Sequence, residues 1–300
     1  MKKLSKVFSA LFCIMLLSAC AAGIQNDETE VRQESTTGVE IEEKDGEEYF
    51  LFQDVEENTY RAELLENVPR NTYDFSHMSV DENTGFSTYH DEENGITSRM
   101  GIDVSEFQGE EIDWEQVRKS GIEFVIIRLG YRAYGESGDL VLDDMFDKNI
   151  KGAMDEGLDT GVYFFSQAVT PTEAVEEAEF VLDHIRPYDI EGPVVYDTEE
   201  IKGDTARTDG NTRQDFTNYC KVFCDTIEHA GYDSMIYANM KWMAFTLDME
   251  ELTDYRFWYA DYHELPQCPY EYTIWQYSEN GTVPGINTPV DLNIWFQKEG

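Results

Sequence analysis

The sequence predicts an α/β protein in which a parallel sheet closes into a barrel from about residue 100 onward. Short apolar runs recur between residues 101 and 296, amphipathic helical stretches separate the earlier runs, and Gly121, Gly157 and Gly231 follow three of those stretches. Strands that alternate with helices at about 30-residue spacing are typical of a parallel sheet. Eight such runs are enough to close the sheet into a barrel.

The expected strands are the apolar runs at residues 101–105, 124–129, 160–166, 193–199, 234–238, 257–262, 273–277 and 290–296. The expected helices lie at residues 114–120, 143–156, 171–185 and 213–230. The third helix has the clearest start, because Thr170 can cap it, Pro171 suits the first helical position and Glu173 lies in the first turn. The last three strands leave little room for helices, so we expect that part to be irregular or antiparallel.

Residues 1–19 have the composition of a targeting segment. Lys2, Lys3 and Lys6 precede an apolar run at residues 7–17 that is too short to span a bilayer. The run ends in Leu17-Ser18-Ala19-Cys20, which resembles the lipobox of bacterial lipoproteins. The resemblance implies that Cys20 carries lipid and attaches the protein to the outer surface of the bacterial cell membrane. The alternative is an ordinary secretory signal with a chance cysteine.

The segment between this signal and the barrel divides in two. Residues 20–48 are acidic and nearly devoid of large apolar side chains, which predicts a disordered linker. Residues 49–98 contain the clusters Tyr49-Phe50-Leu51-Phe52 and Tyr73-Asp74-Phe75 without a lasting period, and we interpret them as a spacer of undetermined structure. We expect the whole segment to extend the reach of an anchored enzyme. The alternative is that it packs on the barrel and completes the cleft. We assign residues 99–300 to the catalytic domain, and expect a chain beginning near Arg99 to fold and act alone.

Charge and cysteine use exclude several classes of partner. Against 62 acidic residues stand 22 basic ones, so the net charge is 22 − 62 = −40. A chain without a basic excess is not expected to bind nucleic acid or, through a polybasic patch, anionic lipid. We read Cys220, Cys224 and Cys268 as small buried apolar groups, and the five histidines show no paired ligand spacing. We therefore expect no metal site and no cofactor, and we expect a monomer.

Four acids stand at the ends of expected strands, where barrels of this type place catalytic groups. Asp197 and Glu199 are two residues apart and therefore project from the same strand face, after the apolar Val195. Burial and mutual repulsion would keep one of the pair protonated near neutral pH, which suits glycosidic cleavage. Asp103 and Asp291 have similar settings on strands that become neighbours if the barrel closes. The alternative is a solvated strand end.

Aromatic and amide side chains lie near the same strand ends. Sugar rings have apolar faces that pack on aromatic rings, while their hydroxyl groups pair with amides and carboxylates. Core filling is the alternative, and we expect about half of these rings to lie in the core. The candidate substrate-binding residues are Tyr163, Phe165, Asn239, Trp258, Tyr262, Gln276 and Tyr277.

Taken in order, these motifs resemble glycoside hydrolase family 25, the lysozyme-type N-acetylmuramidases. The resemblance covers residues 99–300 and leaves out residues 1–98. It rests on Gly101-Ile102-Asp103-Val104-Ser105, Gln108-Gly109, Ile112-Asp113-Trp114, Gly161-Val162-Tyr163-Phe164, Pro193-Val194-Val195 with Asp197 and Glu199, Ile236-Tyr237, Trp258 with Ala260 and Tyr262, Trp275-Gln276-Tyr277, Val283-Pro284-Gly285-Ile286 and Val290-Asp291-Leu292-Asn293.

The resemblance implies a modified TIM-like barrel of five β/α units plus three further strands. It also implies hydrolysis of the β-1,4 bond between N-acetylmuramic acid and N-acetylglucosamine in the glycan strands of peptidoglycan. By position, Glu199 would be the general acid and Asp197 its companion, while Asp103 and Asp291 would line the catalytic end. Either the substrate's 2-acetamido group attacks the anomeric carbon, which we favour, or a carboxylate activates water directly. The competing interpretations are a lipid-anchored carbohydrate-binding protein without turnover and a hydrolase of another acetamido sugar polymer, such as chitin.

Overall fold

The computed structural model describes residues 30–33, 39–109, 111–135 and 137–298. The predicted signal segment, Cys20 and the remainder of the predicted linker up to residue 29 lie outside the described residues, as do residues 34–38.

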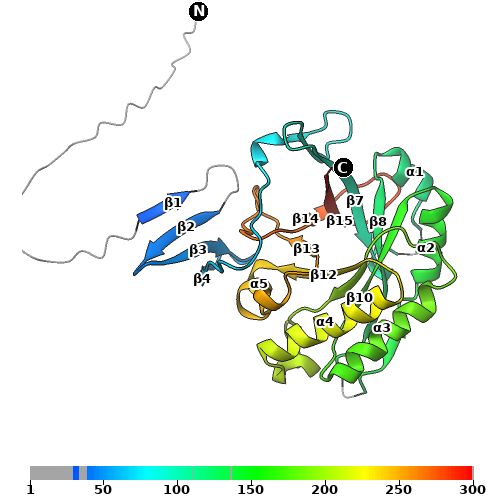
Figure 1. The fold of residues 1–300 in the computed structure, drawn as a ribbon. Coiled ribbons are helices and arrows are strands. Elements are labelled where there is room, and N and C mark those ends of the chain that lie inside the picture. The colour runs from blue at the N-terminus through cyan, green and yellow to red at the C-terminus, as the bar shows by residue number, and fades with distance from the viewer. Residues whose placement is uncertain (1–29, 34–38, 110, 136, 299–300) are drawn as a thin grey trace, which may run out of the picture.

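Eight strands close into the predicted barrel (Figure 1). Neighbours are parallel from the first strand through β14, and the last strand, β15, is antiparallel to both of its neighbours, as the crowded end of the sequence predicted. All eight expected strands are therefore confirmed. In order around the barrel they are β7 (Ile96–Val104), β15 (Val290–Lys298), β14 (Ile274–Gly281), β13 (Phe257–Ala260), β12 (Ser234–Asn239), β11 (Val194–Asp197), β10 (Asp159–Phe165) and β8 (Phe124–Arg132), which returns to β7.

Five helices follow the first five barrel strands and confirm the five β/α units: α1 (Trp114–Lys119), α2 (Phe146–Asp155), α3 (Pro171–Ile185), α4 (Arg213–His229) and α5 (Met240–Phe245). Figure 1 shows α1 to α4 on the outside of the barrel. The helix expected from residue 143 begins three residues later, because the Asp143 carboxylate is fully buried in an ion pair with Arg128. The short helix α5 was not predicted. Its amino-terminal cap is Asn239, which accepts a hydrogen bond from the Trp242 amide.

The third helix shows how sequence determines packing. The Thr170 hydroxyl accepts a hydrogen bond from the Glu173 amide at 3.2 Å, and Pro171 occupies the first turn, as predicted. One face carries Ala174, Ala178, Val181 and Ile185 at helical spacing, and all four are fully buried. Each buried Val or Ile side chain contributes about 1.5–3 kcal/mol, so this stripe holds the helix against the barrel.

The inside of the barrel is filled by its own apolar cluster, formed by Phe124, Ile126, Val195, Met235, Tyr237, Trp258, Ala260 and Ile274. Val195 thus points inward, while Val194 and Tyr196 belong to the larger cluster between the strands and the helices. This alternation is the one predicted for the strand that precedes Asp197 and Glu199.

Four antiparallel strands precede the barrel: β1 (Glu30–Gln33), β2 (Glu40–Lys44), β3 (Glu47–Gln53) and β4 (Thr59–Glu63). The turn between β2 and β3 is Asp45-Gly46, whose φ angles of 57° and 85° are those of the two-residue turn that joins hairpin strands. Residues 40–48 are therefore strands and a turn. This corrects the prediction of a disordered linker there.

This sheet packs against the barrel. The Phe50 ring lies edge-on to Tyr270 with ring centroids 5.9 Å apart, and Phe52 lies 6.0 Å from Phe245 of α5. Gln53 and Gln267 exchange two hydrogen bonds, at 2.8 and 3.1 Å. The alternative that we kept open for residues 49–98, packing on the barrel, describes this region better than a spacer.

The chain then covers the outer face of three barrel strands. The elements here are a 3-10 turn, η1 (Phe75–His77), and the strands β5 (Met78–Val80) and β6 (Ser87–Asp91), of which β6 pairs with β7. The Tyr73 ring stacks on Phe296 with centroids 4.1 Å apart, and Phe75 lies 5.9 Å from Trp275. A domain boundary at residue 99 would therefore cut through β7.

Smaller elements complete the fold: strand β9 (Leu140–Leu142), which pairs with β8, and the 3-10 turns η2 (Glu106–Gln108), η3 (Arg207–Gly210) and η4 (Met249–Glu251).

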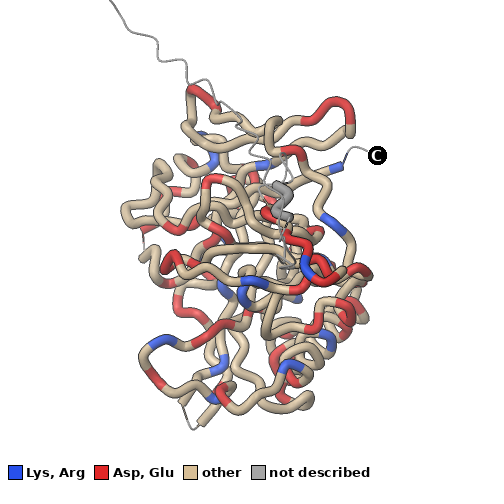
Figure 2. Tube along the Cα trace, turned by 90° about the vertical axis from the view of Figure 1, so that its left-hand side faces the viewer, with Lys and Arg blue, Asp and Glu red and all other residues tan. Residues whose placement is uncertain are grey.

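Cys220, Cys224 and Cys268 are free and buried, as predicted. In the described part of the chain, no helix combines the length and apolarity needed to cross a membrane. Figure 2 shows acidic residues spread along the described part of the trace, with basic residues interspersed among them.

Candidate active site

Asp103 on β7 is a buried acid of the candidate site, with 5% of its surface exposed. Its Oδ2 atom accepts hydrogen bonds from Gln276 Nε2 on β14 and Asn293 Nδ2 on β15, both at 2.8 Å. Burial raises the pKa of Asp103, and the two amide donors partly offset that rise. These donors stabilise a carboxylate in a position where water is scarce.

The two amides are themselves held in one orientation. Gln276 Oε1 accepts from the Tyr262 hydroxyl at 2.8 Å and from the Tyr237 hydroxyl at 3.1 Å. Asn293 Oδ1 accepts from the indole N–H of Trp258 at 2.8 Å. Because each amide oxygen is occupied in this way, each amide nitrogen is directed at Asp103.

Asp291 lies directly across from Asp103, since the two are register partners of β15 and β7. We predicted from the sequence that these strands become neighbours if the barrel closes, and the closed barrel makes them so. Burial and the charge of Asp103 raise the pKa of Asp291 to about 9. Asp291 is therefore a neutral acid at pH 7, which limits the repulsion between the two facing carboxyl groups.

The second carboxyl pair lies at the end of β11. Asp197 is 5% exposed, and burial, then Glu199 and Asp103, raise its pKa well above the usual range. Burial, then the charge of Asp103, raises the pKa of Glu199 to about 7. Asp197 and Glu199 also contact each other by a hydrogen bond, so the pair keeps a proton at neutral pH.

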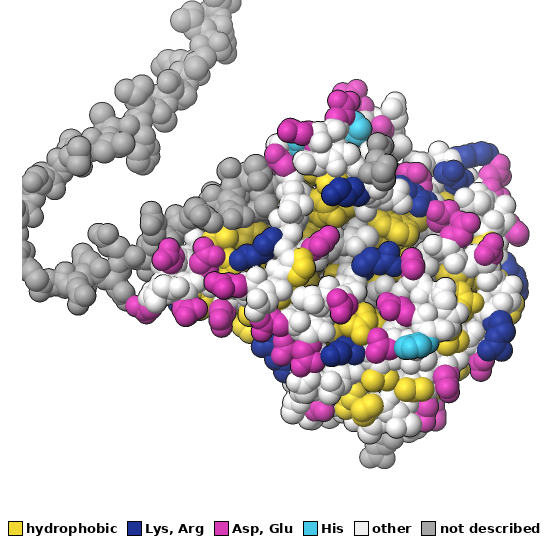
Figure 3. Space-filling model, in the orientation of Figure 1, with side chains coloured by type: hydrophobic (Ala, Val, Ile, Leu, Met, Phe, Trp, Pro, Cys, Tyr) yellow, Lys and Arg dark blue, Asp and Glu magenta, His cyan; other side chains and the backbone are white. Residues whose placement is uncertain are grey.

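Glu199 is the member of this pair that reaches open space. It lines a cleft of about 520 Å³ together with Tyr237, Asn239 and Tyr262 of the barrel. The opposite wall comes from β3, β4 and the loop between them, at residues 52–56, 58 and 60. Figure 3 shows the sheet and the barrel as adjoining surfaces on which acidic side chains outnumber basic ones.

The structure places the remaining predicted residues in different settings. Tyr163 lies inside the barrel, with its ring 6.0 Å from Trp258, and burial and the charge of Asp103 raise its pKa well above the usual range. Phe165 is the register partner of Asp197. Trp258 is 2% exposed, so it orients Asn293 and does not offer a free face to a sugar.

Tyr277, another predicted substrate-binding residue, packs against the outer core cluster and lies away from the four acids. Gln276 points into the barrel, so its neighbours on β14 point outward. The Tyr277 hydroxyl accordingly lies 3.6 Å from the Met100 sulfur and 3.5 Å from the Ser87 amide, under the hairpin of β5 and β6. The expectation that it binds substrate is therefore corrected.

Two residues of the site, Asn293 and Arg128, were not predicted from the sequence. Asn293 follows Asp291 at the two-residue spacing of a strand face, and that spacing was a usable signal. Arg128 on β8 lowers the pKa of Asp197 and is held by Asp143 at 2.7 Å and Glu106 at 2.9 Å. Its position among apolar residues gave no comparable signal.

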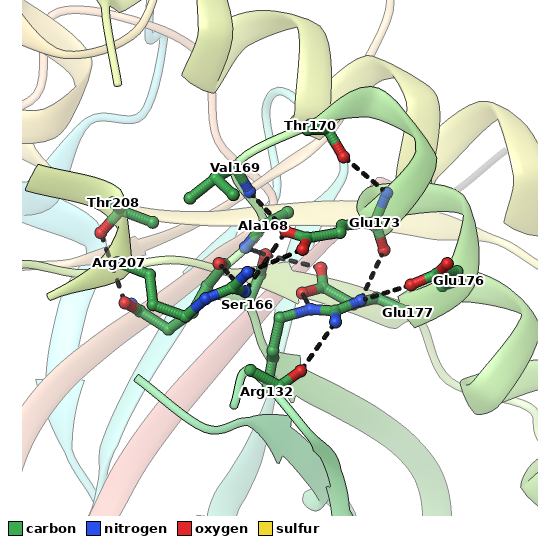
Figure 4. Close-up of polar contacts among 12 residues, drawn as sticks. Arg132, Ser166, Ala168, Val169, Thr170, Glu173, Glu176, Glu177, Arg207 and Thr208 are labelled. Carbon is green, nitrogen blue, oxygen red and sulfur yellow. Dashed lines mark hydrogen bonds and ion pairs between the residues drawn. The ribbon is translucent and has the colours of Figure 1, made fainter. Parts of the chain in front are cut away.

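A buried polar network supports the loops around Asp197 (Figure 4). The Ser166 amide donates to the Asp197 carbonyl at 2.7 Å, and the Ser166 hydroxyl lies 2.6 Å from the Glu177 carboxylate. Glu177 pairs with Arg132 at 2.7 Å, and burial raises the pKa of Glu177 to about 7. The network joins the ends of β8 and β10 to α3, and so fixes the backbone beside β11.

Comparison with known proteins identifies the family. Residues 102–286 match the model of "Glycosyl hydrolases family 25". Over 198 residues the chain is 28% identical to the uncharacterized protein YegX of Escherichia coli, a match that covers 65% of this chain and 68% of YegX. Over 194 residues it is 27% identical to an autolytic lysozyme of Clostridium acetobutylicum, covering 64% of this chain and 54% of the lysozyme.

Among solved structures, the modular autolysin LytC of Streptococcus pneumoniae superposes with a TM-score of 0.58 at 22% identity, covering 84% of this chain and 57% of LytC. This chain therefore spans little more than half of LytC and of the Clostridium lysozyme. The likeness to LytC supports the barrel fold. The family match spans most of the barrel and includes three of the four predicted acids, Asp103, Asp197 and Glu199. It follows that the chain belongs to glycosyl hydrolase family 25 and is a glycoside hydrolase.

Proposed function

We propose that this protein hydrolyses the β-1,4 bond between N-acetylmuramic acid and N-acetylglucosamine in peptidoglycan. The observation that carries the proposal is the proton-sharing pair of Asp197 and Glu199, of which only Glu199 lines the cleft. Two named relatives support the choice of substrate, one an autolytic lysozyme and the other an autolysin studied in complex with a synthetic peptidoglycan ligand.

In the reaction that we favour, Glu199 gives its proton to the glycosidic oxygen as the bond from that oxygen to the anomeric carbon breaks. The oxygen of the substrate's 2-acetamido group forms the new bond to the anomeric carbon, and Asp197 orients that group through its N–H. Water then adds to the anomeric carbon and gives one proton to Glu199. The bond between the anomeric carbon and the acetamido oxygen breaks, which restores the 2-acetamido group. The sequence returns Glu199 to its acid form and needs no cofactor.

The alternative route has one carboxylate activate water for direct attack. The setting of Asp197 favours the first route, because 5% of its surface is exposed and its Oδ1 has no hydrogen-bond partner among the described residues. An acetamido N–H would satisfy that atom.

Mass spectrometry of purified peptidoglycan after digestion tests the proposal. We expect new reducing ends at muramic acid. Reducing ends at N-acetylglucosamine would contradict the proposed bond, cleavage of chitin alone would support the other polymer, and binding without product would support a carbohydrate-binding protein.

We also propose that Cys20 carries lipid and anchors the enzyme outside the bacterial cell membrane. The positive residues, the short apolar run and the lipobox-like tetrad support this. Each buried CH₂ of the lipid contributes about 0.8 kcal/mol to membrane binding, so two acyl chains hold a protein stably at the membrane where one chain would not. Cys20→Ser should therefore release the protein from the membrane fraction. If that variant still sediments with membranes, lipid on Cys20 is not the anchor. That the released protein is a monomer stays a prediction for sedimentation analysis.

A further inference from the structure

We propose that the hairpin formed by β3, β4 and the loop at residues 54–58 is part of the substrate-binding site and contacts the glycan strand. We call it the cleft hairpin. The inference rests on the proposed function and adds to it a binding wall that lies outside the region of the chain matched by the family model.

The loop of the cleft hairpin has a preformed shape. The Asp54 carboxylate accepts hydrogen bonds from the Glu56 amide at 2.9 Å, the Asn58 amide at 3.0 Å and the Tyr60 hydroxyl at 2.9 Å. A loop organised by one central acceptor loses little further freedom when a ligand binds. It therefore has the rigidity expected of a binding wall.

The hairpin is also fixed to the catalytic face. Gln267 exchanges hydrogen bonds with the backbone of Gln53, and the Gln267 amide donates to Asp261 at 2.8 Å. Asp261 immediately precedes Tyr262, which lines the cleft and donates to Gln276 in the Asp103 network. A continuous chain of contacts thus joins the hairpin to the buried carboxylates.

A second connection crosses the cleft mouth. Lys202, three residues after Glu199, lies 3.5 Å from Glu56 of the hairpin. Both side chains are 66% exposed, and an exposed pair of this kind contributes little to stability. The mouth can therefore open at small cost to admit a polymer.

The chemistry of the hairpin suits a sugar. Val55 is 63% exposed, and with Asn58 and Tyr60 it lines the same cleft as Glu199. The Asn58 carboxamide nitrogen and the Tyr60 hydroxyl donate to Asp54, so their oxygen atoms are left to accept from sugar hydroxyl groups. Apolar surface interspersed with amide and hydroxyl groups matches the alternating faces and hydroxyls of a pyranose ring. A strand whose scissile bond lies at Glu199 would place a neighbouring sugar against this wall.

The test uses the soluble chain that begins after Cys20, with Val55→Trp and a matched control, Val80→Trp. Val80 is also 63% exposed and lies on β5, away from the cleft. On soluble glycan fragments we expect Val55→Trp to raise KM about tenfold with little change in kcat, because the new ring fills space that the sugar needs. Val80→Trp should match the parent. Equal melting temperatures would show that both variants are folded.

The same two substitutions in a Glu199→Gln background separate binding from turnover, with pull-down on insoluble peptidoglycan as the measurement. Reduced pull-down by the Val55 variant alone supports the hairpin wall, even if the parent cleaves a different bond. Equal KM and equal pull-down for both variants overturn the wall and leave the proposed function intact. If the parent neither cleaves nor binds peptidoglycan, both proposals fall.

Discussion

Replacing Glu199 by Gln should remove the acid that cleaves the bond while preserving the shape of the site. With the pKa of Glu199 raised to about 7, about 90% of this carboxyl is protonated at pH 6. An ordinary Glu with a pKa of 4.5 would be about 3% protonated, so burial increases the acid form about 30-fold. General acid catalysis contributes about 10²–10⁴-fold, and we expect kcat to fall by that factor.

The assay is the release of reducing ends from peptidoglycan between pH 4 and 9. The parent should lose activity as pH rises through about 7, because the proton on Glu199 is lost. The variant should lack this decline and keep its affinity for the glycan. Glu179→Gln is the matched control, since Glu179 is an exposed residue of α3 that does not line the cleft. The assignment is refuted if Glu199→Gln stays within tenfold of the parent, or if the control is equally impaired.

Three further predictions concern stability. The native state holds a proton on Asp291 up to about pH 9, whereas the unfolded chain loses it near pH 4, so this residue makes stability fall as pH rises between these values. In denaturant titrations, Asp291→Asn should therefore raise the unfolding free energy by about 2–4 kcal/mol at pH 8 and leave it unchanged at pH 3. Glu177→Ala leaves the buried Arg132 without its main partner and should lower the unfolding free energy by about 3–5 kcal/mol, which calorimetry would register as a fall in Tm of about 10 °C. An unchanged Tm would mean that the network in Figure 4 contributes nothing to stability. A chain beginning at Arg99, which we expected from the sequence to fold alone, should aggregate or melt far lower, because it loses the first third of β7 and several buried side chains worth about 1.5–3 kcal/mol each. A folded, fully active product would refute this.

The barrel was predictable because its signals are local. Each strand is an apolar run, and three helices end before a glycine, so element type could be read from short windows. The meeting of Asp103, Asp197 and Glu199 was predictable for a topological reason, since the carboxyl ends of parallel strands lie at one end of a barrel. Asp291 joins them because it lies at the start of β15, which runs antiparallel to β7. No local pattern, however, shows that Gln276 and Asn293 both donate to Asp103, because these residues lie 173 and 190 positions from it in the chain.

The misplacement of Tyr277 has a different cause. Trp275, Gln276 and Tyr277 form one apolar and amide cluster in the sequence, and composition alone favours all three as sugar contacts. On a strand, however, consecutive side chains point to opposite faces, so a Gln276 that binds Asp103 excludes both neighbours from the barrel interior. Strict use of alternation would have separated them. Proximity in sequence was a weaker guide than the strand period.

The amino-terminal region could not have been placed by the same reasoning, because its contacts are almost all long-range. Gln53 bonds to a residue 214 positions away, and Tyr73 stacks on Phe296 near the other end of the described chain. The aromatic residues of this region alternate too briefly to show a period, since β3 buries only Phe50 and Phe52, and β4 contributes only the half-buried Tyr60. The sequence does show how many aromatic residues this region contains. An acidic segment with so many large rings needs a surface to cover them. The barrel offers that surface beside its cleft, and this is why a region that resembles a tether in composition becomes a wall of the site.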